Sequence, residues 1–365
     1  MSNLDFDFDI IWVCEQLGFP IQLNNKRSFN VDCPFCGRQK KLNVNIEKNT
    51  FRCPACDAHG GMLALYQQIC GLESTKEARK ELYRIYNGDI SVNRDIIKKH
   101  KKTIEDLPPL CAATELKTRS ATYVALLDNC SLSQRHQTAL MKRGLSEEAI
   151  KKGQYRSVPQ VGRISLARKL ETMGYEWKGV PGFSRNEKGH VQITENQSGI
   201  FIPIRMRDGK ISGMQIRFDN SKNGRRYIWF TSNNLNEGCS VTGIEQIHYV
   251  GFSEEIPKLI GITEGPLKAD VAHHLLGIPF IAITGVSNTS QLESNLTELK
   301  ALGVKEIHEF FDMDYFTKPT VKTAVDKAHD IICSVGFDKV LRRRWNENYK
   351  GIDDYALARQ QGILK

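Results

Sequence analysis

Two carboxylates, Asp312 and Asp314, end an apolar run in the stretch EIHEFFDMDYFTKP, residues 306–319. If this run is a strand, both side chains point to the same face, because side chains alternate along a strand. Two like charges side by side repel each other, and a bound cation removes that repulsion. Mg²⁺ is typically held by one or two carboxylates together with substrate phosphates. The pair therefore indicates metal-assisted phosphoryl chemistry; the alternative is a solvated strand end without a ligand.

Four of the ten cysteines form the pattern Cys33-x2-Cys36 followed by Cys53-x2-Cys56. Each pair aims two thiolates at one ion, and the residues between the pairs suffice for a small hairpin. Four thiolates at this spacing predict one structural zinc in a ribbon, with His59 as an alternative ligand. A zinc ribbon often only stabilises a fold, so the metal by itself does not indicate a function.

The predicted ribbon also carries basic and aromatic residues, namely Arg38, Lys40, Lys41, Phe51 and Arg52. Bases stack on aromatic rings and phosphates pair with cations, so this combination suits single-stranded nucleic acid. The alternative is an ordinary solvated face.

A second group of basic residues is spread along the strand-like stretch 199–230, which also contains Tyr227 and Trp229. Its members are Arg205, Arg207, Arg217, Arg225 and Arg226. One arginine on a strand usually lies on the surface without a ligand. Five on one meander predict a phosphate-binding face.

The elements that must position the acids can be read from the last third of the chain. Its strand-like stretches are residues 257–265, 278–285, 305–314 and 338–345. Its helix-like stretches are residues 266–277, 289–303, 320–336 and 350–362. This alternation predicts a parallel sheet with helices on both faces, in which ligands collect beyond the carboxyl ends of strands. Glu264 ends the first strand, so the sheet can bring Glu264, Asp312 and Asp314 together.

The whole chain is predicted to be an α+β protein of several domains. Helical spacing after the ribbon extends to about residue 88, and a basic stretch closed by two prolines indicates a linker. The next region begins helically, with Ser146 as a candidate N-cap, and continues into strands joined by a turn at Asp208-Gly209. The predicted domains are a zinc ribbon with helices (1–88), a linker (89–118), a basic mixed α+β region (119–250) and an α/β region with the parallel sheet (251–365).

Composition narrows the classes of protein further. The 365 residues carry a formal net charge of +9, which favours a polyanionic partner. No apolar run is long enough to span a bilayer, and the N-terminus is acidic where a signal peptide is basic, so we expect a cytoplasmic protein without a membrane partner. Reduced thiols and metal ligands are then expected in place of disulfides.

With these motifs in this order, the chain resembles DnaG-type primases, and most closely the Toprim-like primases of phages and mobile elements. Glu264-Gly265 and Asp312-Met313-Asp314 are similar to the glutamate and D-x-D motifs of the Toprim domain. FRCPACDAHGG resembles the primase zinc-binding domain, and LMKRGLSEEAIKKGQY the opening of the RNA-polymerising domain. GIFIPIRMRDGKISGMQIRF, followed by RRYIWF, resembles its basic strand motif.

The sequence departs from the family pattern at several places. The family usually has a histidine where this chain has Cys36. In KGIDDYAL, Gly351 stands where a first acid is usual, which leaves Asp353 as the matching acid with Asp354 beside it. The D-x-D is followed by YFTKPTVKTA in place of a short glycine-containing turn. The family's helicase-binding domain is also not expected in this sequence.

The resemblance implies a nucleotidyltransferase that synthesises short RNA primers on a single-stranded DNA template, in the replication of a phage or mobile element. Nucleotide triphosphates (NTPs) would be substrates and a replicative helicase a candidate partner. The implied catalytic residues are Glu264, Asp312, Asp314 and Asp353, of which the first three would hold Mg²⁺ or Mn²⁺. The implied template- or NTP-binding residues are Arg205, Arg217, Arg225, Arg226, Lys268, Arg38, Lys40 and Lys41.

Two alternatives remain open from the sequence. One is a degenerate primase that only binds single-stranded DNA as a replication adaptor. The other is a Toprim nuclease, although such nucleases commonly occur with an ATPase and the chain has no G-x-x-x-x-G-K-[ST] loop.

Overall fold

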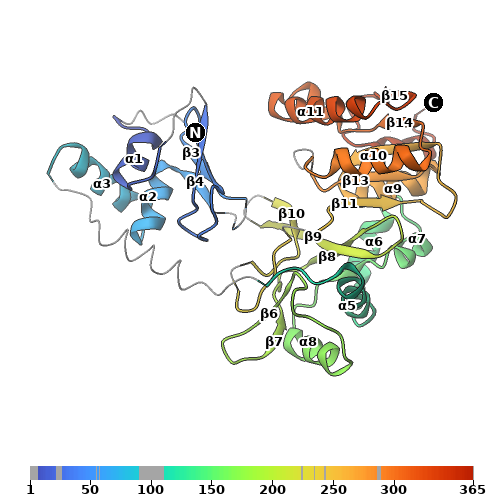
Figure 1. Cartoon of the computed structure of the whole chain (residues 1–365), viewed down its shortest axis with the longest axis horizontal. Helices are drawn as coiled ribbons and strands as arrows, with labels where there is room; N and C mark the ends of the chain where they lie inside the picture. Colours follow the sequence, from blue (N-terminus) through green and yellow to red (C-terminus); the bar gives the residue numbers. More distant parts are fainter. Residues whose placement is uncertain are drawn as a thin grey trace. The chain divides into compact units, whose positions relative to one another are not determined.

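The computed structural model describes residues 7–21, 27–54, 56, 58–89, 111–222, 225–233, 235–241, 244–285 and 289–364. The chain divides into two compact units, residues 1–110 with 233–235, and residues 111–232 with 236–365 (Figure 1). Most of the linker predicted at 89–118 lies outside the described residues. Within the described residues, no helix is long and apolar enough to cross a membrane.

The first unit is built on a four-stranded antiparallel sheet. Its strands, in the order β1-β2-β3-β4, are β1 (Ser28–Val31), β2 (Leu42–Asn45), β3 (Thr50–Arg52) and β4 (His59–Gly61). Three helices belong to the same unit, namely α1 (Ile10–Gln16), α2 (Met62–Cys70) and α3 (Thr75–Tyr86). Leu65 and Tyr66 of α2 and Leu82 of α3 share one core with Val44 of β2 and Phe51 of β3. The helical stretch predicted after the ribbon is thereby confirmed.

The second unit opens with α-helices that pack around an antiparallel sheet. The helices are α5 (Leu116–Asp128), α6 (Gln134–Met141), α7 (Glu147–Lys152) and α8 (Arg163–Thr172). The sheet has the order β10-β9-β8-β5, with strands β5 (Arg156–Ser157), β8 (Gly199–Arg205), β9 (Ile211–Lys222) and β10 (Arg225–Trp229). A separate pair is formed by β6 (Phe183–Arg185) and β7 (Val191–Ile193).

Two local predictions in this region are confirmed. Ser146 is the N-cap of α7, and its side chain accepts a hydrogen bond from the backbone N–H of Ala149. Strands β8 and β9 form a hairpin, and the N–H of Met206 donates to the carbonyl of Lys210 across the turn. Gly209 adopts a φ of 81° there, a left-handed conformation that glycine reaches without a steric penalty.

The rest of the second unit is a five-stranded sheet in the order β11-β13-β12-β14-β15. The strands are β11 (Ile247–Val250), β12 (Leu259–Glu264), β13 (Phe280–Ile283), β14 (Glu306–Glu309) and β15 (Lys339–Arg342). The last four strands are mutually parallel, as the alternation of strands and helices predicted. Strand β11 pairs antiparallel with β13 and was not expected in this sheet.

Helices cover both faces of this sheet. They are α9 (Pro266–Leu276), α10 (Leu292–Leu302), α11 (Pro319–Val335) and α12 (Ile352–Gln360). Ile281 and Ile283 of β13 share a core with α10 and α11, whereas Phe280 and Ala282 of the same strand share a core with α9 and α12. Alternate residues of one buried strand therefore face the two helical layers.

One prediction about this sheet is wrong. The stretch 305–314 was expected to be a strand through Asp314, but β14 ends at Glu309. One further sheet contact follows, from the N–H of Phe310 to the carbonyl of Ile262. The chain then leaves the sheet for a short 3-10 helix, η1 (Met313–Phe316), because the N–H of Met313 bonds to Lys350 instead of a neighbouring strand. The proximity of Asp312 and Asp314 therefore does not come from strand alternation.

Candidate functional site

The predicted acids gather at the carboxyl edge of the parallel strands. Glu264 is the last residue of β12, and Asp312 follows the end of β14. These strands are direct neighbours, since Ile262 pairs with Glu309. Helix α9 starts directly after Glu264, at Pro266, so its first turn lies at the same edge.

Glu264, Asp312, Asp314 and Asp353 form what we call the acid cluster. Lys268, in the first turn of α9, is the most deeply buried lysine in contact with these acids. Its Nζ contacts Oδ1 of Asp312 and lies 3.6 Å from Oε1 of Glu264. Burial opposes the charge of Lys268, but Asp312 and then Glu264 raise its pKa. Burial likewise opposes ionisation of Asp312, yet the lysine lowers its pKa. For Glu264, burial and the charge of Asp312 together raise the pKa to about 7.

A second lysine lies on the outer side of the cluster. The Nζ of Lys350 is 3.1 Å from Oδ2 of Asp312 and 3.3 Å from Oδ2 of Asp314. Lys318 also contacts Asp314, at 2.8 Å from the same oxygen. Oδ1 of Asp314 is buried and has no hydrogen-bond partner within the described parts of the chain. Asp312 and Asp314 thus converge on one cation, although they are not on a strand.

The remaining predicted acid, Asp353, is buried in the first turn of α12 and forms an ion pair with Arg143. Burial opposes the charge of Arg143, whereas Asp353 and then Tyr227 raise its pKa. Gly351 lies at the centre of this group. A Cβ atom at position 351 would be 2.4 Å from Oδ1 of Asp353 and 3.3 Å from Oδ1 of Asp312. The position where the family usually has an acid is therefore directly against the cluster.

The oxygens of Glu264, Asp312, Asp314 and Asp353 do not all lie around one point, as the ligands of a preformed metal site would. Among the described residues, only the four cysteines of the first unit form a group of three or more metal-ligand atoms within 4.8 Å of one another. The oxygens of Asp312 and Asp314 nevertheless surround one exposed ammonium group, and one buried oxygen of Asp314 is unpaired. Carboxylate oxygens are ligands that Mg²⁺ and Mn²⁺ accept, so this pair fits such an ion.

One predicted arginine shares the region of the acid cluster. Arg217 lies on the same face of β9 as Gln215, whose side-chain amide donates to the carbonyl of Thr284, directly after β13. Tyr227 of β10 pairs with Arg217 across the sheet. The face of the antiparallel sheet that carries Arg217 is therefore turned toward the carboxyl ends of the parallel strands. The Nε atom of Arg217 is buried and unpaired among the described residues.

The other predicted arginines are placed differently. Arg226 is exposed, at an irregularity in the pairing of β9 with β10. Arg207 is an exposed partner of Glu298, and the side chain of Arg225 lies outside the described part of the structure. Arg205 donates hydrogen bonds to the carbonyls of Gly209 and Gly153. The structure thus turns the sheet face that carries Arg217 toward the edge of the acid cluster, whereas Arg205 bonds to backbone carbonyls elsewhere.

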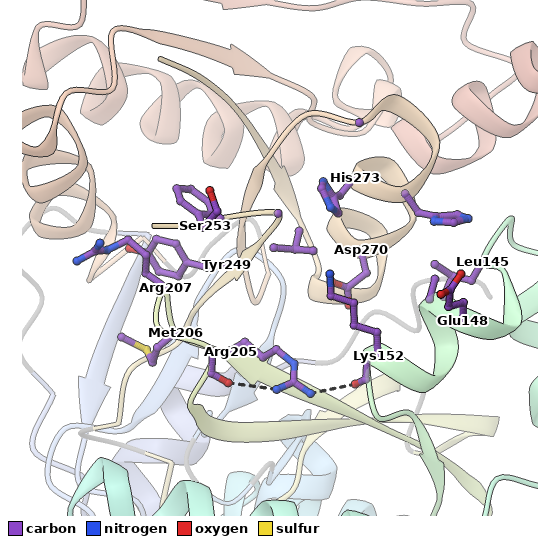
Figure 2. Close-up of a pocket in the computed structure, with 18 of the residues that line it drawn as sticks. Leu145, Glu148, Lys152, Arg205, Met206, Arg207, Tyr249, Ser253, Asp270 and His273 are labelled. Atoms are coloured by element: carbon purple, nitrogen blue, oxygen red, sulfur yellow. Dashed lines mark hydrogen bonds between the residues drawn. The ribbon is translucent and has the colours of Figure 1, made fainter. Parts of the chain in front are cut away.

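Arg205 belongs to a pocket of about 980 Å³ between α7, α9, β11 and the β8–β9 turn (Figure 2). Its lining mixes both charges, with Lys152, Asp270 and His273 among the side chains. Asp270 is not free for a ligand, because it accepts hydrogen bonds from Tyr155 and from Nε2 of His248, 3.0 Å away. None of the acids at the carboxyl edge of the parallel strands lines this pocket.

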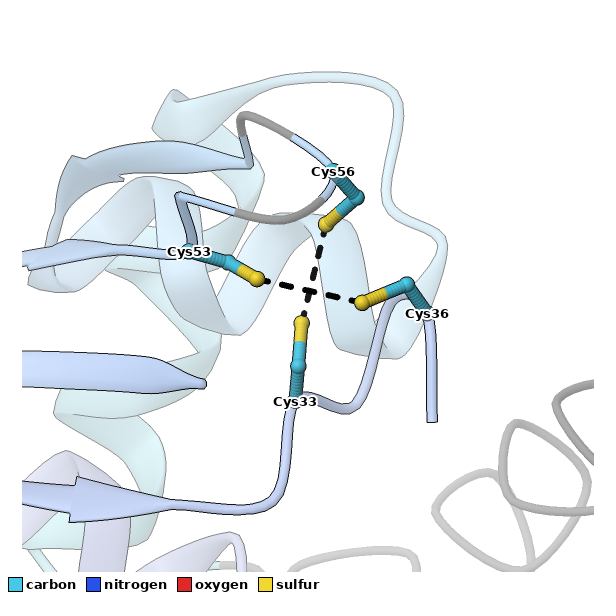
Figure 3. A group of neighbouring side chains, drawn as sticks. All are labelled: Cys33, Cys36, Cys53 and Cys56. Carbon is cyan, nitrogen blue, oxygen red and sulfur yellow. Dashed lines mark hydrogen bonds between the residues drawn. The ribbon is translucent and has the colours of Figure 1, made fainter. Parts of the chain in front are cut away.

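The four cysteines of the first unit form a compact cluster (Figure 3). Cys33 Sγ lies 3.7 Å from Cys56 Sγ, and Cys36 Sγ lies 3.8 Å from Cys53 Sγ. Zinc–sulfur bonds of about 2.3 Å in a tetrahedron place the sulfurs about 3.8 Å apart. The cluster is therefore compatible with one structural zinc ion bound by the four cysteines. The alternative ligand His59 lies exposed at the start of β4.

Of the ribbon residues expected to contact nucleic acid, the basic ones reach the surface. Lys40, Lys41 and Arg52 are exposed and Arg38 is partly so. Phe51, however, is buried against Phe35, with ring centroids 5.7 Å apart. The expectation that Phe51 offers its ring to a base is wrong, because its apolar surface forms the core of the unit.

The chain is similar to known proteins in sequence over one region and in fold over nearly its whole length. Residues 249–362 match a domain of unknown function, DUF3854. No curated protein matches the chain. Among solved structures, the zinc-binding and RNA polymerase domains of the Aquifex aeolicus primase are similar over 98% of this chain and 81% of that chain, with 16% identity and a TM-score of 0.52. This chain has the fold of a DnaG-type primase.

Two further solved structures are similar to the chain. The RNA polymerase domain of Mycobacterium tuberculosis primase DnaG has 16% identity over 68% of this chain and 82% of that chain, with a TM-score of 0.49. The primase fragment of the bacteriophage T7 primase-helicase protein has 13% identity over 92% and 95% of the two chains, with a TM-score of 0.38. The similarity to the Aquifex aeolicus primase, and not these two, confirms for the fold the primase resemblance expected from the sequence.

Three cationic partners of the acid cluster were not predicted from the sequence, namely Arg143, Lys318 and Lys350. Arg143 lies in the loop between α6 and α7, about two hundred residues before its partner Asp353. No local pattern joins positions so far apart. The contact between Lys318 and Asp314 could have been predicted, because Lys318 stands four residues after Asp314. Side chains at that spacing meet on one side of a helical turn.

Proposed function

We propose that the protein is a DNA primase, a nucleotidyltransferase that synthesises short RNA primers on single-stranded DNA. In this proposal the ribbon unit binds template, the region 119–250 carries basic residues for template or NTP, and the region 251–365 is a Toprim catalytic domain. The sequence also predicts a cytoplasmic location, a role in the replication of a phage or mobile element, and a helicase partner. These three points remain predictions.

One observation carries the proposal. Glu264, Asp312, Asp314 and Asp353 gather at the carboxyl edge of the parallel strands, and the Arg217 face of the antiparallel sheet is turned toward that edge. Acids beside cationic side chains suit a reaction in which a negatively charged triphosphate must be held close to metal-binding groups. The primase fold supports the same reading.

The roles of the residues follow from their positions. Asp312 and Asp314, with Glu264 behind them, would hold Mg²⁺ or Mn²⁺, which when bound would neutralise charge on the triphosphate and lower the pKa of the attacking 3′-hydroxyl. Arg217, with one unpaired buried nitrogen, would bind a phosphate of the template or the NTP. Asp353 would orient Arg143 toward the same substrate.

A synthesis assay tests this proposal. The full chain is incubated with single-stranded DNA of mixed sequence, labelled NTPs and Mg²⁺ or Mn²⁺, and short RNA products are expected on a denaturing gel. Products should disappear when the divalent ion is omitted. Bound but uncopied DNA would overturn the proposal, and cleaved DNA would indicate a nuclease instead.

One observation favours the second candidate, a non-catalytic DNA-binding adaptor. Each carboxylate of the acid cluster already has a cationic partner within the protein, because Lys268, Lys318, Lys350 and Arg143 contact them. An acid cluster neutralised by side chains has less need of a metal ion. The same assay separates this candidate, which predicts DNA binding without RNA products.

A further inference from the structure

The acid cluster contains two separate cation positions that share Asp312. The inner position lies between Glu264 and Oδ1 of Asp312 and holds the Nζ of Lys268. The outer position lies between Oδ2 of Asp312 and Oδ2 of Asp314 and holds the Nζ of Lys350. A divalent ion can enter either position only if the lysine there moves away.

The two lysines differ in how easily they can leave. The side chain of Lys350 is 58% exposed, so it can move into solvent, and Asp312 and Asp314 would then keep their contacts with Lys268 and Lys318. The side chain of Lys268 is 14% exposed, and its removal would leave Asp312, itself almost fully buried, with a charge uncompensated on the inner side. Breaking a buried ion pair in this way is strongly unfavourable.

The backbone beside Lys268 is shaped for its side chain. A Cβ atom at position 351 would lie 3.1 Å from Cε of Lys268, closer than ordinary van der Waals contact. The absence of a side chain at Gly351 therefore makes room for the stem of the lysine. Any acid at position 351 would have to displace it. Glycine at 351 is therefore compatible with the present position of the Lys268 side chain.

The outer position has the features of a site for an added ion. Its present cation is exposed, and Asp314 contributes a further oxygen, Oδ1, that is buried and unpaired among the described residues. An ion between Asp312 and Asp314 could therefore gain a ligand oxygen that Lys350 does not use.

We propose that Lys268 is a built-in cation that keeps the inner position, so that the acid cluster binds one divalent ion, in the outer position in place of Lys350. This inference rests on the proposed function, because it concerns the metal of the same site. Lys268 acts as a positioning residue: it fixes the orientation of Asp312 and sets the number of ions.

Metal titration of the full, zinc-loaded chain tests the inference. Mn²⁺ is added, and the bound ion is counted by calorimetry and by the loss of the free Mn²⁺ signal in electron paramagnetic resonance. We expect one Mn²⁺ per chain in the parent protein and two in Lys268→Met, whose unbranched side chain is one atom shorter and carries no charge. Lys268→Arg, which keeps the charge, should bind one. Lys350→Met is the matched control and should also bind one, more tightly than the parent.

Several outcomes would overturn the inference. Two Mn²⁺ ions in the parent protein, or none, contradict it directly, as does one ion with unchanged affinity in Lys268→Met. If Lys268→Met is unfolded without metal, thermal unfolding replaces the count. Mn²⁺ should then raise its melting temperature by more than it raises that of the parent, and an equal shift would argue against the inference.

Primer synthesis by the same preparations separates this inference from the proposed function. A parent chain that binds one Mn²⁺ but makes no primers would refute the proposed function and leave the role of Lys268 intact. A parent chain that makes primers with two bound ions would do the reverse.

Discussion

Asp312 is the residue on which the chemistry of the site depends most directly, because both of its oxygens face a cation position. Replacement by asparagine keeps the shape of the side chain and removes its charge. We expect Asp312→Asn to lower primer synthesis by about a hundredfold or more, the scale seen when one electrostatic contact to a reacting group is lost. Single-stranded DNA affinity should stay the same or increase slightly, because one repulsion with phosphate is removed. Asp326→Asn, a partly exposed acid of α11 that pairs with Lys322 and Arg342, is the control and should leave both quantities unchanged.

Asp353 belongs to the cluster in a different way, because its partner is Arg143 and not one of the lysines between the acids. We expect Asp353→Asn to leave Mn²⁺ affinity within about twofold of the parent, whereas Asp312→Asn should weaken it by about tenfold or more, a difference of about 1.4 kcal/mol. The measurement is Mn²⁺ titration of both variants. Equal losses of Mn²⁺ affinity in the two variants would show that Asp353 binds the metal as directly as Asp312 does.

Arg217 should act on substrate and not on the metal. If Arg217 holds template, Arg217→Ala should weaken single-stranded DNA binding at every sequence, and the slope of log K against log salt should become shallower by about 0.7, the value for one phosphate contact. Fluorescence anisotropy at several salt concentrations measures both. Arg207→Ala, an exposed arginine paired with Glu298, is the matched control. If Arg217 instead holds the NTP, the slope stays unchanged and the apparent KM for NTP increases.

At the scale of elements, the site depends on close packing between β12 and β13. A Cβ atom on Gly261 of β12 would lie 2.3 Å from the ring of Phe280, its partner on β13. We expect Gly261→Ala to lower the free energy of unfolding by about 1–3 kcal/mol, the usual cost of an overfilled core. Chemical denaturation measures this. The double variant with Phe280→Leu should recover part of the loss, and simple additivity of the two losses would contradict the packing argument.

At the scale of the whole molecule, the chain has two compact units with separate cores. The zinc cluster belongs to the first unit, and metal binding and folding are coupled in ribbons of this kind. We therefore expect about one zinc per chain, and Cys36→Ser should lose it. Hydrogen exchange should then accelerate across residues 27–89 and stay unchanged in the core strands of the second unit. Well-folded parent protein without zinc, or loss of protection in both units, would contradict this prediction.

Local patterns in the sequence were enough for the zinc cluster and for the parallel sheet. Four cysteines at C-x-x-C spacing can bind one ion only if their knuckles meet, so the spacing itself carries the geometry. Strands β12 to β15 alternate with helices, and that order allows few arrangements other than a parallel sheet. Glu264 and Asp312 were placed at one edge by the same rule, because parallel strands end together.

The tertiary structure alone decided how the charge of the acid cluster is balanced. Lys268, Lys350 and Arg143 come from three different segments, and side-chain contacts between such segments depend on packing that no local period describes. Packing also decided that Phe51 is core and that Arg205 bonds to backbone carbonyls instead of facing the acids. Sequence by itself determined which groups could carry charge, aromatic surface or metal ligands. Burial and the crossing of distant segments determined which of them meet, because an ion pair forms where the fold removes two opposite charges from water together.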